Sequence, residues 1–150
     1  MRWIQSETNG HYFWTLYDYV RSNYDFEKIE VDLISDHSSD LNQFDHSFIE
    51  SIIGEIDLYL TRGIDYIQSE LRRDPQQFML NDSLHNDVEK YAAVAPHEFP
   101  VSKPHIIFYP DSSFWLMRFS ETAFPAINDR GIALFFNKDG DVTDFIILPE

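Results

Sequence analysis

The sequence contains no cysteine, and it is poor in glycine, with five residues, and in lysine and arginine, with eleven. Without cysteine there is no disulfide, no thiolate metal ligand and no cysteine nucleophile. No apolar run approaches the roughly 18 residues that suggest a membrane helix. The first ten residues lack the basic and then apolar pattern of a secretory signal. We therefore expect a soluble, cytoplasmic protein without a membrane anchor.

The charge is strongly one-sided, because 26 acidic residues face 11 basic ones and give a formal net charge of −15. Such a field repels phosphate backbones, which argues against direct nucleic-acid binding. It would speed the encounter with a basic protein. In the competing interpretation the charge only provides solubility.

The 150 residues include 43% hydrophobic and 16% aromatic residues, which is enough for one packed core and too much for a disordered regulator. We expect a single domain over 1–150. An aromatic run, 11–17, follows a turn signal at Asn9-Gly10 and predicts a strand. Over 26–34 apolar and charged residues alternate, so a second strand should carry Glu30 and Asp32 on its polar face.

Apolar residues at helical spacing predict one long helix that starts after Asp45 and ends at Asp74-Pro75. Asp45 suits the N-cap position, because its carboxylate can accept a hydrogen bond from an N–H of the first turn. Phe44 and Ile49 are placed as a hydrophobic staple across this start.

A shorter helix is predicted to begin near Asp82 or Ser83 and to end before Pro96, followed by a connector over 96–104. After it come strands at 105–109, 113–119, 131–136 and 142–148. The order of strands, helices and strands indicates an α+β fold, in which a long and a shorter helix pack on one face of an antiparallel sheet.

None of the motifs that mark an enzyme or a metal site is present. The cluster 36–40, Asp-His-Ser-Ser-Asp, offers triad residue types, but neighbouring side chains diverge, so a polar loop is the better interpretation. The six histidines lack metal-site spacing. A calcium loop aligned on Gly140 would place Phe135 and Ile146 at ligand positions, which excludes it. We expect neither an enzyme nor a cofactor or metal.

Two surfaces are candidates for binding a partner protein. On a helical wheel, Glu50 and Asp57 flank the apolar stripe, while Leu58 and Asp65 point away from it. An apolar Leu58 framed by carboxylates has the pattern of a small hot spot with an acidic rim. Alternatively, Leu58 is a tolerated surface residue or packs under a loop.

The second candidate surface is the polar strand face that carries Glu30 and Asp32, followed by two more acidic residues, Asp36 and Asp40. A carboxylate row on this face suits a basic protein partner. The alternative is an ordinary solvated face of an antiparallel sheet.

The acidic strand 29–33, the two helices after it and the closing hairpin 131–140, Gly-Ile-Ala-Leu-Phe-Phe-Asn-Lys-Asp-Gly, resemble small α+β immunity proteins of bacterial toxin systems, including contact-dependent inhibition. The resemblance implies a cytoplasmic inhibitor that binds one cognate toxin domain, often a basic nuclease, with one-to-one stoichiometry. It transfers no binding residues. The alternatives are an acidic nucleic-acid mimic and an enzyme without recognisable motifs.

Overall fold

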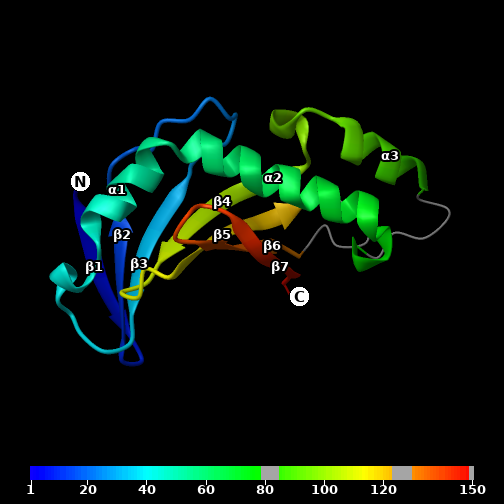
Figure 1. The fold of residues 1–150 in the computed structure, drawn as a ribbon. Coiled ribbons are helices and arrows are strands. Elements are labelled where there is room, and N and C mark those ends of the chain that lie inside the picture. Colours follow the sequence, from blue (N-terminus) through cyan, green and yellow to red (C-terminus); the bar gives the residue numbers. More distant parts are fainter. Residues whose placement is uncertain (79–84, 123–129, 149–150) are drawn as a thin grey trace.

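A computed structural model describes residues 1–78, 85–122 and 130–148, and its main feature is one seven-stranded sheet (Figure 1). The strands follow one another in the sheet in the order of the sequence. They are β1 Trp3–Thr8, β2 His11–Leu16, β3 Glu30–Ser35, β4 Val101–Phe108, β5 Phe114–Thr122, β6 Ile132–Asn137 and β7 Val142–Ile147.

All neighbouring strands of the sheet are antiparallel except β3 and β4, which pair in parallel. Parallel neighbours need a crossover, and the helical segment between β3 and β4 provides it. The α+β class is therefore confirmed, with a mostly antiparallel sheet. The prediction of a purely antiparallel sheet is wrong at this one pair.

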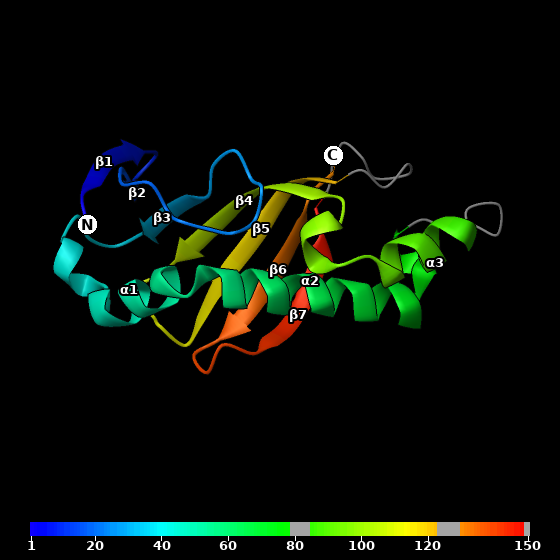
Figure 2. The ribbon, with the colours of Figure 1, turned by 90° about the horizontal axis from the view of Figure 1, so that it is seen from above.

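The described part of the crossover contains three α-helices: α1 His46–Gly54, α2 Ile56–Arg73 and α3 His85–Ala93. Helices α1 and α2 run across one face of the sheet, and α3 lies beside the C-terminal half of α2 (Figures 1 and 2). Short 3-10 turns occur at η1 Leu41–Gln43, η2 Pro75–Phe78 and η4 Pro96–Glu98. None of the helices in the described ranges is long and apolar enough to cross a membrane.

The start of the first helix is as predicted, because the Asp45 carboxylate accepts a hydrogen bond from the Phe48 N–H at 3.1 Å. The single long helix is wrong, since the chain leaves helical geometry at Glu55, where φ is −121° and ψ is 34°. The preceding Gly54 ends α1, and glycine is among the weakest helix formers. The predicted start of the shorter helix, at Asp82 or Ser83, lies outside the described residues.

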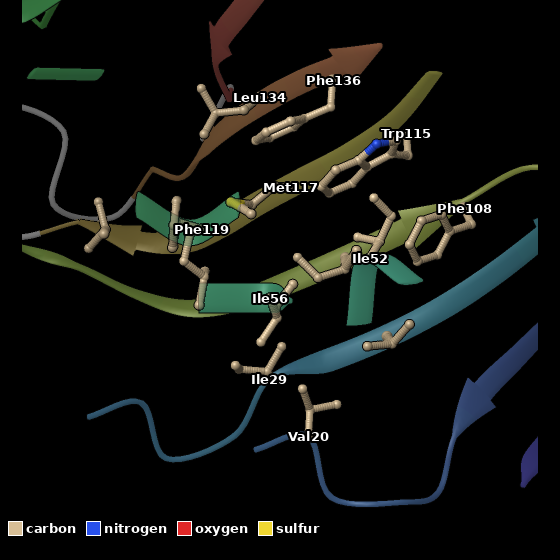
Figure 3. Packing of buried hydrophobic residues seen from close by; sticks show 14 of the residues in the cluster. Val20, Ile29, Ile52, Ile56, Phe108, Trp115, Met117, Phe119, Leu134 and Phe136 are labelled. Carbon is tan, nitrogen blue, oxygen red and sulfur yellow. The ribbon is translucent and has the colours of Figure 1, made fainter. Parts of the chain in front are cut away.

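The core lies between the helices and the sheet (Figure 3). The rings of Trp115 and Phe136 stack with centroids 4.2 Å apart. Helix α2 approaches these strands closely at Gly63, where a Cβ atom would lie 2.8 Å from Leu134 Cδ1. A side chain at Gly63 would therefore push the helix away from the sheet.

Two strands begin about four residues away from their predicted starts. Strand β3 begins at Glu30 rather than at residue 26, and β4 begins at Val101, inside the predicted connector. Pro104 is tolerated in β4 because the pairing with β3 begins only at the next residue, His105, opposite Glu30. Residues 17–29, between β2 and β3, form an irregular loop instead of lengthening β3.

Candidate partner-binding surface

The segment between β2 and β3, residues 17–29, crosses over to the start of α2 and is fixed there. Two of its apolar residues, Val20 and Ile29, are both 6% exposed and point into the core (Figure 3). The Asp57 carboxylate accepts a hydrogen bond from the Asn23 N–H at 2.8 Å and another from the Ser22 hydroxyl. This segment is consequently a built part of the structure and not a loose loop.

A second contact between the segment and α2 lies one helical turn beyond Asp57. The hydroxyls of Tyr24 and Thr61 share a hydrogen bond at 2.6 Å, and the Tyr24 ring stacks on Phe26 with centroids 5.6 Å apart. Burial, followed by the nearby carboxylates of Asp65 and Asp57, raises the pKa of Tyr24, although its hydrogen bond with Thr61 acts in the opposite direction. Tyr24 thus stays neutral and holds the segment in place.

A cleft of about 950 Å³ opens between the segment and residues 97–104. Tyr17 and Tyr19, which are 59% and 73% exposed, lie in its wall together with Phe26, Phe99 and Glu30. Large aromatic rings at this exposure are typical of binding surfaces, since each offers much contact area at a small entropic cost. We refer to this hollow as the cleft.

The cleft carries an excess of negative charge. Its lining includes four carboxylates, from Asp18, Asp25, Glu27 and Glu30, against the ammonium groups of Lys28 and Lys103 and the imidazole of His97. The Lys103 ammonium is already bonded to the Glu121 carboxylate at 2.6 Å. A cationic side chain entering the cleft would therefore meet mostly carboxylates and aromatic rings.

The chain itself shows how this lining can hold a guanidinium group. The guanidinium carbon of Arg2 lies 3.7 Å from the centroid of the Tyr17 ring, in cation–π geometry. The backbone N–H of Arg2 donates to the Asp18 carboxylate at 2.7 Å. The Tyr17 ring thus holds the Arg2 guanidinium group, while the Asp18 carboxylate binds the Arg2 backbone.

Asp32 lies next to this region, on the sheet face opposite the helices. Its carboxylate is hydrogen-bonded to His105 Nε2 at 2.7 Å, and both side chains are about four-fifths buried. Burial raises the pKa of Asp32, but hydrogen bonds from His105 and Thr15 and the positive charges of His105 and Lys28 outweigh it, so the pKa lies below its ordinary value. The Thr15 hydroxyl contacts Asp32 and not the imidazole, so this group lacks the order of a catalytic triad.

The structure separates the six predicted partner-binding residues. Glu30 is exposed and lines the cleft, and Asp32 is about four-fifths buried in its pair with His105. On the helices, Leu58 is 43% exposed and Asp65 is exposed, whereas Asp57 is half-buried against the segment. Glu50 is exposed on α1, on the other side of the break at Glu55.

Sequence reasoning missed the aromatic wall of the cleft. The available signal was the run Tyr17-Asp18-Tyr19, in which two tyrosines flank an aspartate directly after a strand. Tyr19 lines the cleft and also a second, smaller hollow of about 370 Å³, where Asp57 is a further lining residue.

Within the described ranges, no three histidine, aspartate or glutamate side chains are grouped so that they could hold a metal ion. Comparisons with protein-family models, with curated proteins and with solved structures found no match to this chain. Its class is therefore defined by its own fold and cleft: an acidic α+β protein with a seven-stranded mixed sheet and an aromatic, carboxylate-lined hollow.

Proposed function

We propose that this chain is an immunity protein: a cytoplasmic inhibitor that binds one cognate bacterial toxin domain of basic charge, and neutralises it with one-to-one stoichiometry. The observation that carries the proposal is the cleft, where exposed tyrosines and an excess of carboxylates surround about 950 Å³. The net charge of −15 supports the same kind of partner, because complementary potentials accelerate association.

The cleft suits a lysine or arginine side chain of the partner as its anchor. A cation over Tyr19, close to carboxylates such as Asp25 and Glu30, would gain both cation–π and charge-assisted hydrogen-bond energy. Arginine and aromatic residues dominate binding hot spots for these reasons. The wall carries the aromatic residues, so the partner should supply the cation.

The anchoring of the segment favours tight binding. Its hydrogen bonds to Asp57 and Thr61 hold the tyrosine-bearing wall in place before the partner arrives. A preformed wall avoids the entropic cost of ordering a loop on binding. Inhibition then needs no chemistry from this chain, since occupying the active site or an essential surface of the toxin is sufficient.

The test uses a defined probe: the C-terminal domain of a large secreted protein encoded beside this gene. Co-expression of the two proteins in a bacterial host should restore growth that the toxin domain alone arrests. Isothermal titration calorimetry should show one-to-one binding, and stopped-flow kinetics should show association that slows as salt rises. Unrestored growth, or no heat of binding, contradicts the proposal.

A further inference from the structure

The two edges of the sheet differ in how far their backbone groups are satisfied. At the β1 edge, the Tyr17 N–H donates to the Arg2 carbonyl at 2.9 Å, and six residue pairs follow in one unbroken register. Hydrogen-bonded pairs alternate along an antiparallel ladder, so Ile4, Ser6 and Thr8 turn their backbone groups toward β2. The N–H and C=O groups of Trp3, Gln5 and Glu7 therefore point outward.

The opposite edge, β7, carries protection against pairing. The Leu148 N–H donates to Gly131 O at 2.8 Å, which sets the alternation and turns the Phe145 N–H outward. That N–H donates to the Asp144 carboxylate at 2.8 Å. A register shift between Phe135 and Phe136 further distorts this ladder. The Asp144 carboxylate thus occupies a donor that a further strand would need. Bulges are a known way to protect an edge strand from pairing.

Strand β1 has none of these devices. It contains no proline, no lysine and no register shift, and Glu7 is its one charged residue. All of its residues except Trp3 are exposed, including Ile4 at 54%. Among the described residues no other strand pairs with its outer side. A regular, exposed and nearly uncharged edge is a template for another strand.

We infer that the β1 edge binds the β1 edge of a second copy of this chain, in antiparallel orientation. Centred on Gln5, this pairing sets each Trp3 opposite Glu7 of the second copy and each Gln5 opposite its equivalent. The two Glu7 carboxylates then lie at opposite ends of the ladder.

The alternative parallel arrangement sets the two Glu7 side chains side by side, which is unfavourable. Antiparallel pairing also joins the two seven-stranded sheets through outward-facing backbone groups alone, without rearranging either chain. A charge of −15 on each copy opposes the contact. Association should therefore strengthen as salt rises, because screening shortens the range of the repulsion from about 30 Å at 0.01 M to about 3 Å at 1 M.

The experiment is sedimentation equilibrium of the full chain at low and high salt. We expect the mass of two chains to dominate at high salt and high protein concentration. Gln5→Pro should weaken the dimer about thirtyfold or more, because each dimer loses the two hydrogen bonds donated by the central residues. Proline is tolerated in the monomer, since the Gln5 N–H points away from β2. The matched control, Gln5→Thr, keeps the N–H and should still dimerise.

Hydrogen exchange of the wild-type chain tests the same inference without a variant. The amides of Trp3, Gln5 and Glu7 should exchange slowly only at high protein concentration, whereas those of Ile4 and Ser6 should be slow throughout. The mass of one chain at every salt and up to about 1 mM protein, the weak end of specific association, would overturn the inference. A dimer that persists in Gln5→Pro would do the same.

Discussion

The Asp57 carboxylate lies 2.8 Å from the backbone nitrogen of Asn23, a residue 34 positions earlier in the chain. It also accepts a hydrogen bond from the Ser22 hydroxyl. These contacts join the start of α2 to the 17–29 segment and thereby support the wall of the cleft. Asp57, which the helical wheel placed on a partner-facing flank, thus has a structural role in the free protein.

The first prediction follows from that anchor. Asp57→Ala should lower the free energy of unfolding by about 1–3 kcal/mol, since it leaves the donors of Ser22 and Asn23 without their acceptor. Asp65→Ala is the matched control, because Asp65 is an exposed aspartate on the same helix. Urea denaturation measures both. Equal midpoints for the two variants would show that the anchor contributes nothing.

The second prediction concerns the hairpin between β6 and β7. Gly140 has a φ of 83°, and a Cβ atom there would lie 2.7 Å from Tyr59 Cε1. Its carbonyl accepts a hydrogen bond from Arg62 at 3.1 Å, which ties the turn to α2. Gly140→Val should destabilise the protein by about 1–3 kcal/mol through backbone strain alone, and the clash adds to it.

The control for the hairpin is Lys138→Val, an exposed position in the same turn without the positive φ. Its thermal melt should stay close to that of the wild type. If Gly140→Val had the same melting temperature as Lys138→Val, the turn would accept a side chain at residue 140 without loss of stability.

The third prediction is a pH dependence of stability. The pKa of Asp32 lies below its ordinary value of 3.8 in the folded chain, so the folded state favours the ionised carboxylate. Its contribution is complete above about pH 5 and is lost as the pH falls through 3.8 toward the folded-state pKa. Asp32→Asn should therefore cost stability at pH 6 and progressively less toward pH 3.

Chemical denaturation of the wild type and of Asp32→Asn across this range measures the effect. A difference in stability that stays constant with pH would show that the pair with His105 does not depend on the charge of Asp32.

The fourth prediction separates the two sides of α2. Leu58 is 43% exposed, so Leu58→Ala should leave the thermal melt almost unchanged. Ile56, two residues earlier, is 2% exposed, and Ile56→Ala should cost about 2–5 kcal/mol. A Leu58→Ala protein that melts several degrees lower would place this side chain under a loop.

Local signals predicted the elements whose residues interact mainly with near neighbours. Asp45 caps the first turn of α1, and residues 11–16 of the aromatic run form β2, because both depend on adjacent residues. The apolar spacing of α2 was equally clear, but the same spacing continues across Glu55, so the periodicity did not reveal the break. Hydrophobic period alone does not detect a change of backbone direction.

Other features depend on contacts between distant residues. Strand β1 is exposed on both faces, so Gln5, Ser6 and Glu7 show no alternation that would predict a strand. The parallel pairing of β3 with β4 joins segments about 75 residues apart, as in Glu30 with His105. The cleft likewise forms only when the 17–29 segment meets residues 97–104, and no local pattern in either stretch indicates the other.

The central claim is that a basic partner binds in the cleft, and charge reversal at matched positions tests it most directly. Asp25→Lys with Glu30→Lys changes the cleft, while Glu50→Lys with Asp65→Lys makes the same change in net charge on the exposed helix surface. The measurement is the association and dissociation rate of the neighbouring toxin domain by surface plasmon resonance, with thermal melts to establish folding.

The account predicts that the cleft variant dissociates at least tenfold faster and no longer protects cells, whereas the helix variant mainly associates more slowly. Equal losses in both variants, or a larger loss in the helix variant, would contradict it.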